Sequence, residues 1–267
     1  MKHLSTAFAA AGVTFALVSV YPAMAQGEAS SLDAIIAKGK LSVCTSFSTP
    51  PYGITDADLK PAGFDIAVAN LLARDLAVEL ELVDVASQAR IPSLNGGNCD
   101  VLISSFGVTA ERAKTVWYSV PIYVDTQTVI APSSTNFSSY EDLVGKNIGV
   151  TRGSTNDTLL TENALPGTNI MRFEDAATGN QALFSGQVDG LVSGTAAAFT
   201  ITKETDQFKP QFPMRTSPMG VGIRKGETDL LQWVNTEIML LWNSGELQAA
   251  QQEWIGTVNE DLHNYWF

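Results

Sequence analysis

The chain has 267 residues, of which 45% are hydrophobic and 16% charged, a composition typical of a globular protein. Asp and Glu number 28 against 16 Lys and Arg, and this acidic surplus argues against binding to nucleic acid or to anionic lipid. The two histidines, His3 and His263, lie near the ends of the sequence, so histidine-based catalysis and a histidine-rich metal site are nearly excluded.

The first 25 residues have the pattern of a cleaved signal peptide. Lys2 gives a positive start, a mostly apolar run extends from Leu4 to Val20, and Ala23-Met24-Ala25 matches a small-residue cleavage site. A membrane anchor is the alternative, but the apolar run is short and closes on that cleavage site. No later stretch of the sequence reaches the length of about 18 apolar residues that a membrane span needs. We therefore expect an exported protein of the periplasm.

Two cysteines, Cys44 and Cys99, enter an oxidising space on export, where a cysteine pair is often bridged. Cys44 lies late in the predicted strand Leu41–Thr45, whereas Cys99 begins the predicted strand Cys99–Ser104. If these strands are parallel neighbours, the thiols lie several residues out of register at about 3.3 Å per residue. That separation is beyond the reach of a disulfide, so we expect two buried free thiols.

Short apolar strands alternate with helices at the start of the exported chain. Apolar side chains recur at helical spacing from Ile66 to Leu76, which predicts a helix over Asp65–Leu76 after the Pro- and Gly-rich loop Ser48–Gly63. The other elements expected here are the helices Leu32–Lys38 and Ile91–Leu94 and the strands Leu41–Thr45, Glu79–Val85 and Val101–Ile103. This alternation is typical of βαβ units and a parallel sheet.

The alternation restarts in a second segment. The strand-like run Tyr123–Ala131 leads into it, and Val221–Ile223 is its last predicted strand. Between them we expect the strands Ile148–Thr151, Met171–Phe173 and Gly190–Ser193, a helix beginning near Asn156 and a helix over Ala176–Ser185. Two C-terminal helices, Asp229–Asn243 and Glu246–Trp254, meet at Gly245. The sequence therefore predicts two α/β lobes, the first completed by the C-terminal helices.

No catalytic or cofactor-binding motif stands out. The sequence has no Gly-x-Ser-x-Gly elbow, no P-loop, and no Gly-x-Gly-x-x-Gly opening a helix after the first strand. Paired carboxylates remain open in so acidic a chain, but no spacing singles a pair out, and surface charge explains them more simply. We expect neither enzymatic activity nor a cofactor or metal.

Polar residues follow two predicted strands. The loop 104–112 after Val101–Ile103 holds Ser104, Ser105 and Arg112, and hydroxyls with a guanidinium suit a carboxylate. In the second lobe, Ser154 and Thr155 open a helix whose free N–H groups favour an anion. Ordinary strand-end polarity and an ordinary helix N-cap are the alternatives.

These stretches resemble the periplasmic amino-acid-binding proteins of ABC importers. The resemblance runs in order over almost the whole exported chain, through Gly63-Phe64-Asp65-Ile66, Arg90-Ile91-Pro92-Ser93-Leu94, Ser104-Ser105-x-x-x-Thr109-x-x-Arg112, Gly153-Ser154-Thr155, Gly186-Gln-Val-Asp189, Gly222-Ile-Arg224-Lys225, Gly245-Glu-Leu247 and Glu253-Trp254-Ile255-Gly256. It implies the type II periplasmic binding protein fold, in which each lobe is a mainly parallel sheet flanked by helices and two hinge strands join the lobes. We expect residues 26–124 and 221–267 in lobe 1, residues 125–220 in lobe 2, and a ligand between them.

The resemblance also implies roles for single residues. Arg112 would bind the ligand's α-carboxylate, helped by the N–H groups of Gly107 and Thr155. Ser105 would bond to the ligand, and Ser104 would support the loop. The family usually has an aspartate, which pairs with the ligand's ammonium group, at the position of Gly194. It also often has a charged residue at Ser46.

Other residues point to a site for negative charge. Ser87-Gln88-Ala89-Arg90 resembles the stretch through which acidic-amino-acid binders hold the side-chain carboxylate with Ser87 and Arg90, and Arg152 could add a third cation. Structural salt bridges are the alternative for Arg90 and Arg152. Phe47 is the candidate stacking wall, since Thr49 replaces the aromatic residue that the family often has.

The sequence thus predicts a monomeric receptor that binds a polar, carboxylate-bearing amino acid or a close relative. Its other partner would be an ABC permease in the inner membrane, which recognises the closed, liganded state. Two alternatives stay open: an enzyme on this scaffold of the dehydratase kind, and a sensor that feeds a signalling receptor. A general acid in the cleft would favour the enzyme.

Overall fold

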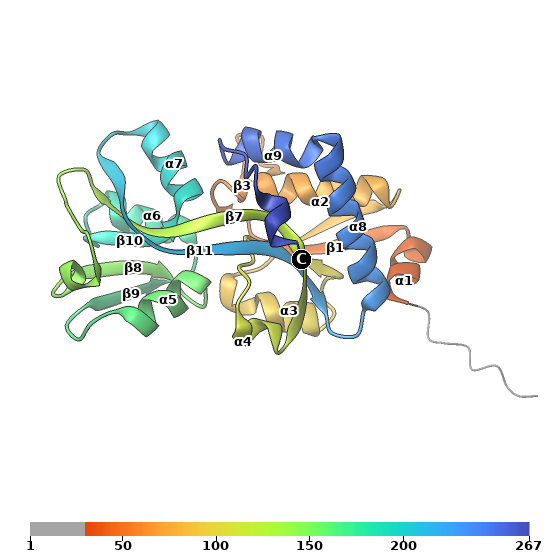
Figure 1. Cartoon of the computed structure of the whole chain (residues 1–267), viewed down its shortest axis with the longest axis horizontal. Coiled ribbons are helices and arrows are strands. Elements are labelled where there is room, and N and C mark those ends of the chain that lie inside the picture. Colours follow the sequence, from red (N-terminus) through yellow and green to blue (C-terminus); the bar gives the residue numbers. More distant parts are fainter. Residues whose placement is uncertain (1–29, 267) are drawn as a thin grey trace, which may run out of the picture.

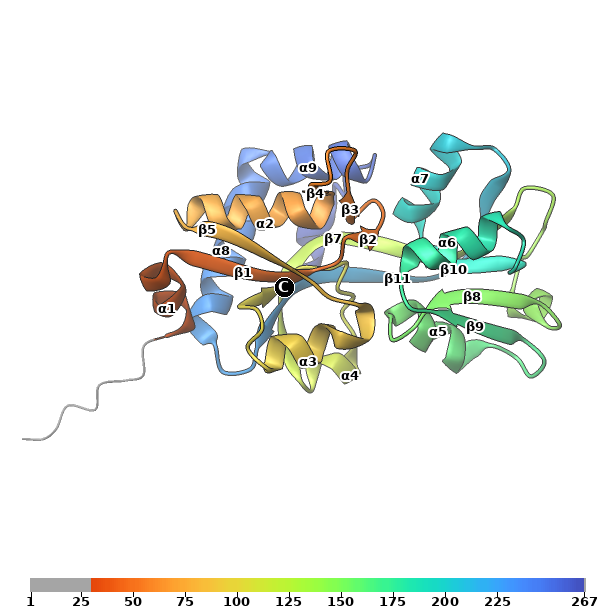
Figure 2. The ribbon, with the colours of Figure 1, turned by 180° about the vertical axis from the view of Figure 1, so that it is seen from behind.

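The computed structural model describes residues 30–266, and the predicted signal peptide lies outside them. Figures 1 and 2 show two α/β lobes side by side, connected by two long strands. These strands are β7 (Val116–Pro132) and β11 (Phe208–Arg224). None of the helices in the described residues is both long and apolar enough to cross a membrane.

Lobe 1 holds both ends of the described chain. Its strands are β1 (Lys40–Thr45), β2 (Ser48–Thr49), β3 (Gly53–Thr55), β4 (Pro61–Ala62), β5 (Glu79–Asp84) and β6 (Val101–Leu102). Its helices are α1 (Ser31–Lys38), α2 (Phe64–Asp75), α3 (Arg90–Asn95), α4 (Ala110–Ala113), α8 (Thr228–Ser244) and α9 (Glu246–Trp254), with 3-10 turns at Ser87–Ala89 and Leu262–Tyr265. The predicted elements of this lobe are present, with boundaries shifted by one or two residues.

Lobe 2 is smaller and uninterrupted in sequence. Its strands are β8 (Asn147–Thr151), β9 (Asn169–Phe173) and β10 (Gly190–Gly194). Its helices are α5 (Thr155–Asn163), α6 (Ala176–Phe184) and α7 (Thr195–Glu204), with a 3-10 turn at Tyr140–Leu143. Helix α7 was not expected from the sequence, and both long strands extend well beyond the expected runs Tyr123–Ala131 and Val221–Ile223.

One eight-stranded sheet runs through both lobes, in the order β5-β1-β6-β11-β7-β10-β8-β9. Within lobe 1, β5, β1 and β6 are parallel, and within lobe 2, β10, β8 and β9 are parallel. The two long strands pair antiparallel with each other and join these parallel sets. A separate three-stranded sheet, β2-β3-β4, occupies the Pro- and Gly-rich loop.

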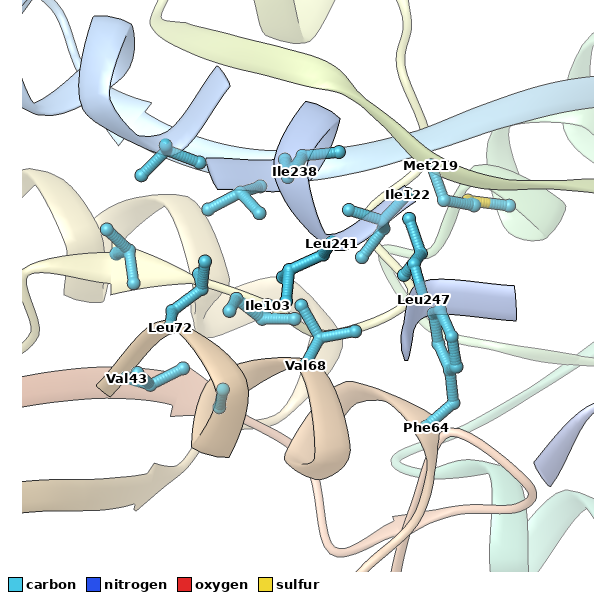
Figure 3. Close-up of a cluster of buried hydrophobic side chains, with 14 of the residues drawn as sticks. Val43, Phe64, Val68, Leu72, Ile103, Ile122, Met219, Ile238, Leu241 and Leu247 are labelled. Atoms are coloured by element: carbon cyan, nitrogen blue, oxygen red, sulfur yellow. The ribbon is translucent and has the colours of Figure 1, made fainter. Parts of the chain in front are cut away.

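Each lobe has its own hydrophobic core. In lobe 1, α2, α8 and α9 cover one face of the sheet, where Leu72, Ile103 and Leu241 meet (Figure 3). In lobe 2, consecutive residues of β7 alternate between two cores: Val129 packs with α5, and Ile130 packs with α6 and α7. Because side chains alternate along a strand, one strand serves both faces. The cores of the two lobes thus share this pair of strands.

Cys44 and Cys99 form a disulfide, so the prediction of two free thiols is wrong. Strands β1 and β6 are parallel neighbours, with Cys44 opposite Leu102. Cys99, however, lies before β6 in the turn that follows α3, and this turn brings the two Cα atoms within 5.6 Å. Treating Cys99 as part of a straight strand caused the error.

We predict that replacing both cysteines, Cys44→Ala with Cys99→Ala, lowers the free energy of unfolding by about 2–4 kcal/mol, because the unfolded chain loses a cross-link. Urea unfolding followed by tryptophan fluorescence measures the change. A reductant should lower the wild-type midpoint to that of the variant and leave the variant unchanged. Equal midpoints for wild type and variant would contradict the prediction.

Candidate ligand-binding site

A pocket lies between the lobes, beside the middle of β7 and β11. It is lined by residues of both lobes, and six predicted site residues are among them: Ser87, Arg90, Ser105, Ser154, Thr155 and Gly194. The loops after β6 and β8 therefore meet across the cleft, as the carboxyl ends of parallel strands do in open α/β sheets.

The lobes touch at the rim of this pocket. The Arg112 guanidinium of lobe 1 donates through Nη2 to the Gly153 carbonyl of lobe 2 at 3.1 Å. Nearby, Gln88 Nε2 donates to the Glu174 carboxylate at 3.0 Å, again from lobe 1 to lobe 2. These bonds cross the cleft, so the structure shows a closed arrangement of the lobes.

Ser105 is held by a buried carboxylate of α2. The N–H of Ser105 donates to Asp65 Oδ2 at 2.6 Å, and Ser105 has a φ of 39°, rarely adopted outside glycine. The Asp65 side chain is 2% exposed, and burial raises its pKa to about 7, although the Ser105 N–H and nearby Arg90 act in the opposite direction. Ser104 is also buried, below the loop rather than among the lining residues. This strained turn aims the Ser105 side chain at the cleft.

Arg90 is a buried cation without a protein partner. Arg90 is the first residue of α3 and is 4% exposed. Within residues 30–266, its guanidinium has no hydrogen bond or ion pair. Burial, with a contribution from Arg112, lowers its pKa to about 10. Nearby Asp65 favours the charged form but makes no ion pair with Arg90. A buried charge is costly unless it is paired, so an anion in the pocket would stabilise Arg90.

Arg112 lies at the rim and not among the lining residues. Its guanidinium stacks 4.8 Å from the centre of the Phe106 ring and donates through Nη1 to the Gly107 carbonyl at 3.2 Å. Burial lowers its pKa. The Gly107 N–H, expected to contact a ligand, donates instead to the Ser105 carbonyl at 3.1 Å. A guanidinium has five N–H donors, so Arg112 keeps donors for a carboxylate.

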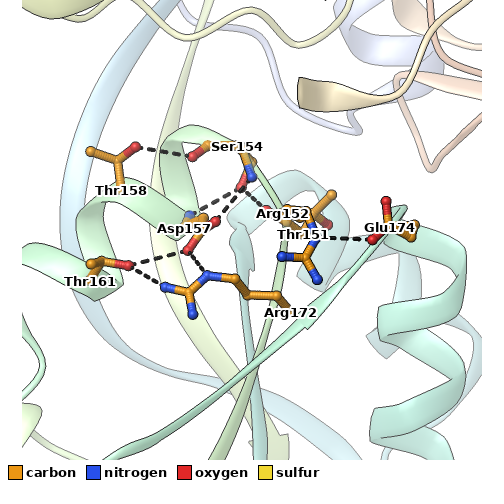
Figure 4. A network of polar contacts seen from close by, with 9 residues as sticks. Thr151, Arg152, Ser154, Asp157, Thr158, Thr161, Arg172 and Glu174 are labelled. Atoms are coloured by element: carbon orange, nitrogen blue, oxygen red, sulfur yellow. Dashed lines mark hydrogen bonds and ion pairs between the residues drawn. The ribbon is translucent and has the colours of Figure 1, made fainter. Parts of the chain in front are cut away.

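Figure 4 shows how the start of α5 is built. Ser154 is its N-cap: the Ser154 hydroxyl accepts from the Asp157 N–H and donates to the Thr151 carbonyl. Thr155 follows as the first helical residue, whose N–H has no partner within the helix. Arg152 lies outside the pocket, with Nε donating to Glu174 at 2.9 Å. The salt bridge, left open as the alternative for Arg152, is the arrangement found here.

Phe47 is half-buried and does not line the pocket, and its backbone N–H donates to Asp84. An aromatic wall comes instead from Tyr52 and Tyr123, which stack with ring centres 5.2 Å apart. Both rings are buried at the junction of lobe 1 and the hinge.

The pocket also holds two polar residues of β7 that the sequence analysis missed, Asp125 and Gln127. Asp125 is 5% exposed, and burial raises its pKa, although bonds from Tyr52 and Thr195 oppose this shift. Gln127 is fully engaged, since it accepts from Arg215 and donates to residues of α5. A charged residue inside the apolar run Tyr123–Ala131 was the available signal for Asp125.

No group of three metal-ligating side chains is found in residues 30–266. The polar groups of the pocket comprise one guanidinium, one carboxylate, three side-chain amides, several hydroxyls and the N–H groups that open α5. Such a set can bind a small zwitterion or anion by charge-assisted hydrogen bonds.

Comparison with known families agrees with this geometry. Residues 41–257 match the family of bacterial extracellular solute-binding proteins, family 3. The chain belongs to this family. The resemblance drawn from the sequence is therefore confirmed, and so is the type II periplasmic binding protein fold.

Members of this family are similar to the chain over most of its length. The L-cystine-binding protein TcyJ of Escherichia coli K12 is 28% identical, covering 96% of this chain and 97% of TcyJ. A mutant of the arginine-binding protein ArgBP of T. maritima has a TM-score of 0.80 at 30% identity, over 85% of this chain and 99% of ArgBP. An ancestral amino-acid-binding protein, AncCDT-1, is described as a precursor of cyclohexadienyl dehydratase. It has a TM-score of 0.80 at 30% identity, covering 85% of this chain and 100% of AncCDT-1.

We predict that Asp65 makes the protein less stable as the pH rises from about 4 to about 7. The folded pKa of about 7 exceeds the ordinary 3.8, so in this window the folded state binds more protons than the unfolded state. The stability contribution is complete below pH 4 and lost toward pH 7, by up to about 4 kcal/mol. Urea unfolding of wild type and Asp65→Asn across this range tests it, and parallel curves would contradict it.

Proposed function

We propose that this protein is the periplasmic receptor of an ABC importer, which binds a polar, carboxylate-bearing amino acid between its lobes and has no catalytic role. The observation that carries the proposal is the Arg90 guanidinium, buried in an inter-lobe pocket without a partner among the described residues. An anionic group of the ligand supplies the missing partner. The amino-acid receptors among its relatives, such as the cystine-binding protein TcyJ, support the ligand class.

The charges favour an acidic or neutral amino acid over a basic one. Arg112, which keeps free donors at the rim, binds the α-carboxylate, and Arg90 binds a second acidic or polar group. Arg152 has no part in this proposal because Glu174 neutralises it. A ligand with two carboxylates would satisfy both arginines, whereas a basic side chain would face an unpaired guanidinium.

Ligand binding is coupled to closure of the lobes. The contacts of Arg112 with Gly153 and of Gln88 with Glu174 exist only when the lobes meet, so a ligand in the pocket stabilises the closed state. A permease that recognises this state would then accept the ligand. The alternative partner is a signalling receptor that recognises the same closed state.

The enzyme alternative has one supporting observation, a buried carboxylate in the cleft. However, Asp125 accepts hydrogen bonds from Tyr52, Thr195 and the Ala196 N–H, which stabilise its ionised form and so disfavour a role as general acid. The similarity to a dehydratase precursor concerns an ancestral protein that is itself described as amino-acid-binding. We therefore favour the receptor.

The proposal predicts that acidic and neutral amino acids raise the melting temperature more than lysine, arginine or histidine do. A thermal-shift screen of the twenty L-amino acids with succinate and glutarate measures this. Arg90→Gln should weaken the strongest acidic binder at least about 30-fold by removing a buried ion pair, whereas the rim variant Arg152→Gln should change it only a few-fold. A basic amino acid as the strongest binder would contradict the charge assignment.

Arg112→Ala should weaken L-glutamate or L-glutamine, whichever binds more tightly to the wild type, by at least about 100-fold. The substitution leaves a desolvated carboxylate without its guanidinium partner. Isothermal calorimetry gives both affinities, and Lys114→Ala, which removes an exposed cation two residues away, is the matched control. Affinity within a few-fold of the wild type would exclude Arg112 as the carboxylate-binding residue.

A further inference from the structure

Gly194 stands at the position where the resemblance to amino-acid-binding receptors implies an aspartate for the ligand's ammonium group. Its backbone, with φ −85° and ψ 160°, is open to any residue, so backbone conformation does not require glycine here. The space does require it. A Cβ atom on Gly194 would lie 2.7 Å from the carboxylate carbon of Asp125 and would overlap the carboxylate oxygen Oδ2.

Asp125 therefore occupies the volume that a side chain at position 194 would fill. It comes from the hinge strand β7, opposite Ser217 of β11, and lines the same pocket as Gly194 and Arg90. Two elements far apart in the sequence thus compete for one place. In this chain the carboxylate enters from the hinge and not from the start of α7.

The Asp125 carboxylate is positioned by neutral donors from both lobes. Tyr52 of lobe 1 donates its hydroxyl to Oδ2 at 2.6 Å. In lobe 2, the Thr195 hydroxyl donates to Oδ1 at 2.7 Å, and the Ala196 N–H donates to Oδ1 at 3.4 Å. Oδ2 has one donor and therefore a free lone pair.

Nothing in the described part of the chain neutralises this charge. No lysine, arginine or histidine there forms an ion pair with Asp125, whose side chain is 5% exposed. Burial raises its pKa, as expected for a carboxylate that lacks a cation. A cationic group in the pocket would restore the balance, just as an anion would at Arg90.

We propose that Asp125 binds the ammonium group of the amino-acid ligand, taking over from the hinge strand the role that the resemblance assigns to position 194. This inference rests on the proposed function, since it needs an amino acid in the pocket. Binding to Asp125 also connects the ligand to both lobes, because the same carboxylate contacts Tyr52 and the start of α7. The ligand's ammonium group thereby joins a network that contacts both lobes.

Pairs of probes that differ only in the ammonium group test the proposal. The pairs are L-glutamate and glutarate, L-aspartate and succinate, and L-glutamine and glutaramate. Calorimetry on the wild type should show that each amino acid that binds does so at least about 10-fold more tightly than its deaminated partner. Equal affinities within the pairs would overturn the proposal.

Two variants assign this preference to a residue. Asp125→Asn keeps the shape and the acceptor oxygen but removes the charge, and should reduce the preference to within about 3-fold. Asp125→Ala combined with Gly194→Asp returns the carboxylate to the opposite element and should restore at least about 10-fold. Thr126→Val, which alters the same strand at a residue that pairs with Thr216 away from the pocket, should leave the preference unchanged.

The outcomes separate the two proposals. A preference that survives in Asp125→Asn overturns the role of Asp125 and leaves the amino-acid receptor intact. Wild-type protein that binds none of the six probes and none of the other amino acids overturns the receptor function, and the role of Asp125 with it. If circular dichroism shows that Asp125→Asn does not fold, Asp125→Ala alone decides: a lost preference supports the proposal, and a retained preference overturns it.

Discussion

The antiparallel pairing of β7 with β11 is the constraint on which the rest of the structure depends. Each strand is 17 residues long, and their register runs from Phe208 opposite Pro132 to Arg224 opposite Val116. The first part of β7 packs in the core of lobe 1 and its second part in the cores of lobe 2. Because both lobes use the same two strands, polar residues at the middle of the pair lie between two hydrophobic cores. The cleft follows from this arrangement.

The buried charges of the cleft are unfavourable for the empty protein. Arg90, Asp65 and Asp125 are each at most 5% exposed, yet no ion pair within the described chain joins any of them to an opposite charge. Burial lowers the pKa of the arginine and raises those of both carboxyls, which are the directions that oppose charge. A protein selected for stability alone would replace such groups or pair them. Their retention in one small region is typical of a binding site.

Most of the elements could be predicted from apolar periodicity, but the hinge strands could not. The helix over Asp65–Leu76 and strand Leu41–Thr45 appear almost as expected, because each buries one face or both faces in a single core. Strand β11 contains Pro210, Pro213 and Pro218, which usually exclude a central strand. The register shifts at Pro210 and Pro213, so their missing N–H donors fall where the ladder is already irregular, whereas Pro218 pairs in regular register with Val124. The local sequence does not indicate these register shifts.

The site residues on loops and at helix starts could be predicted from the sequence, whereas those on the hinge strands could not. Arg90, Ser105 and Thr155 follow strand ends or open helices, positions at which polar residues already suggest a ligand. The disulfide was missed for a related reason, since the turn before β6 cannot be derived from strand periodicity. Asp125 lies within an apolar strand, and only tertiary packing shows which side chain it approaches.

The absence of an acidic residue at position 194 does not mean that the pocket lacks an acidic group. Considered alone, glycine at this position removes the acid that the resemblance implies opposite an ammonium group, and the sequence then predicts a site for negative charge. In the folded chain, Asp125 fills the space, and glycine is the residue that admits it. The two positions are 69 residues apart and form one structural unit, because β7 and β10 pair with Gln127 opposite Gly194. A carboxylate at either position would therefore give the pocket the same charge.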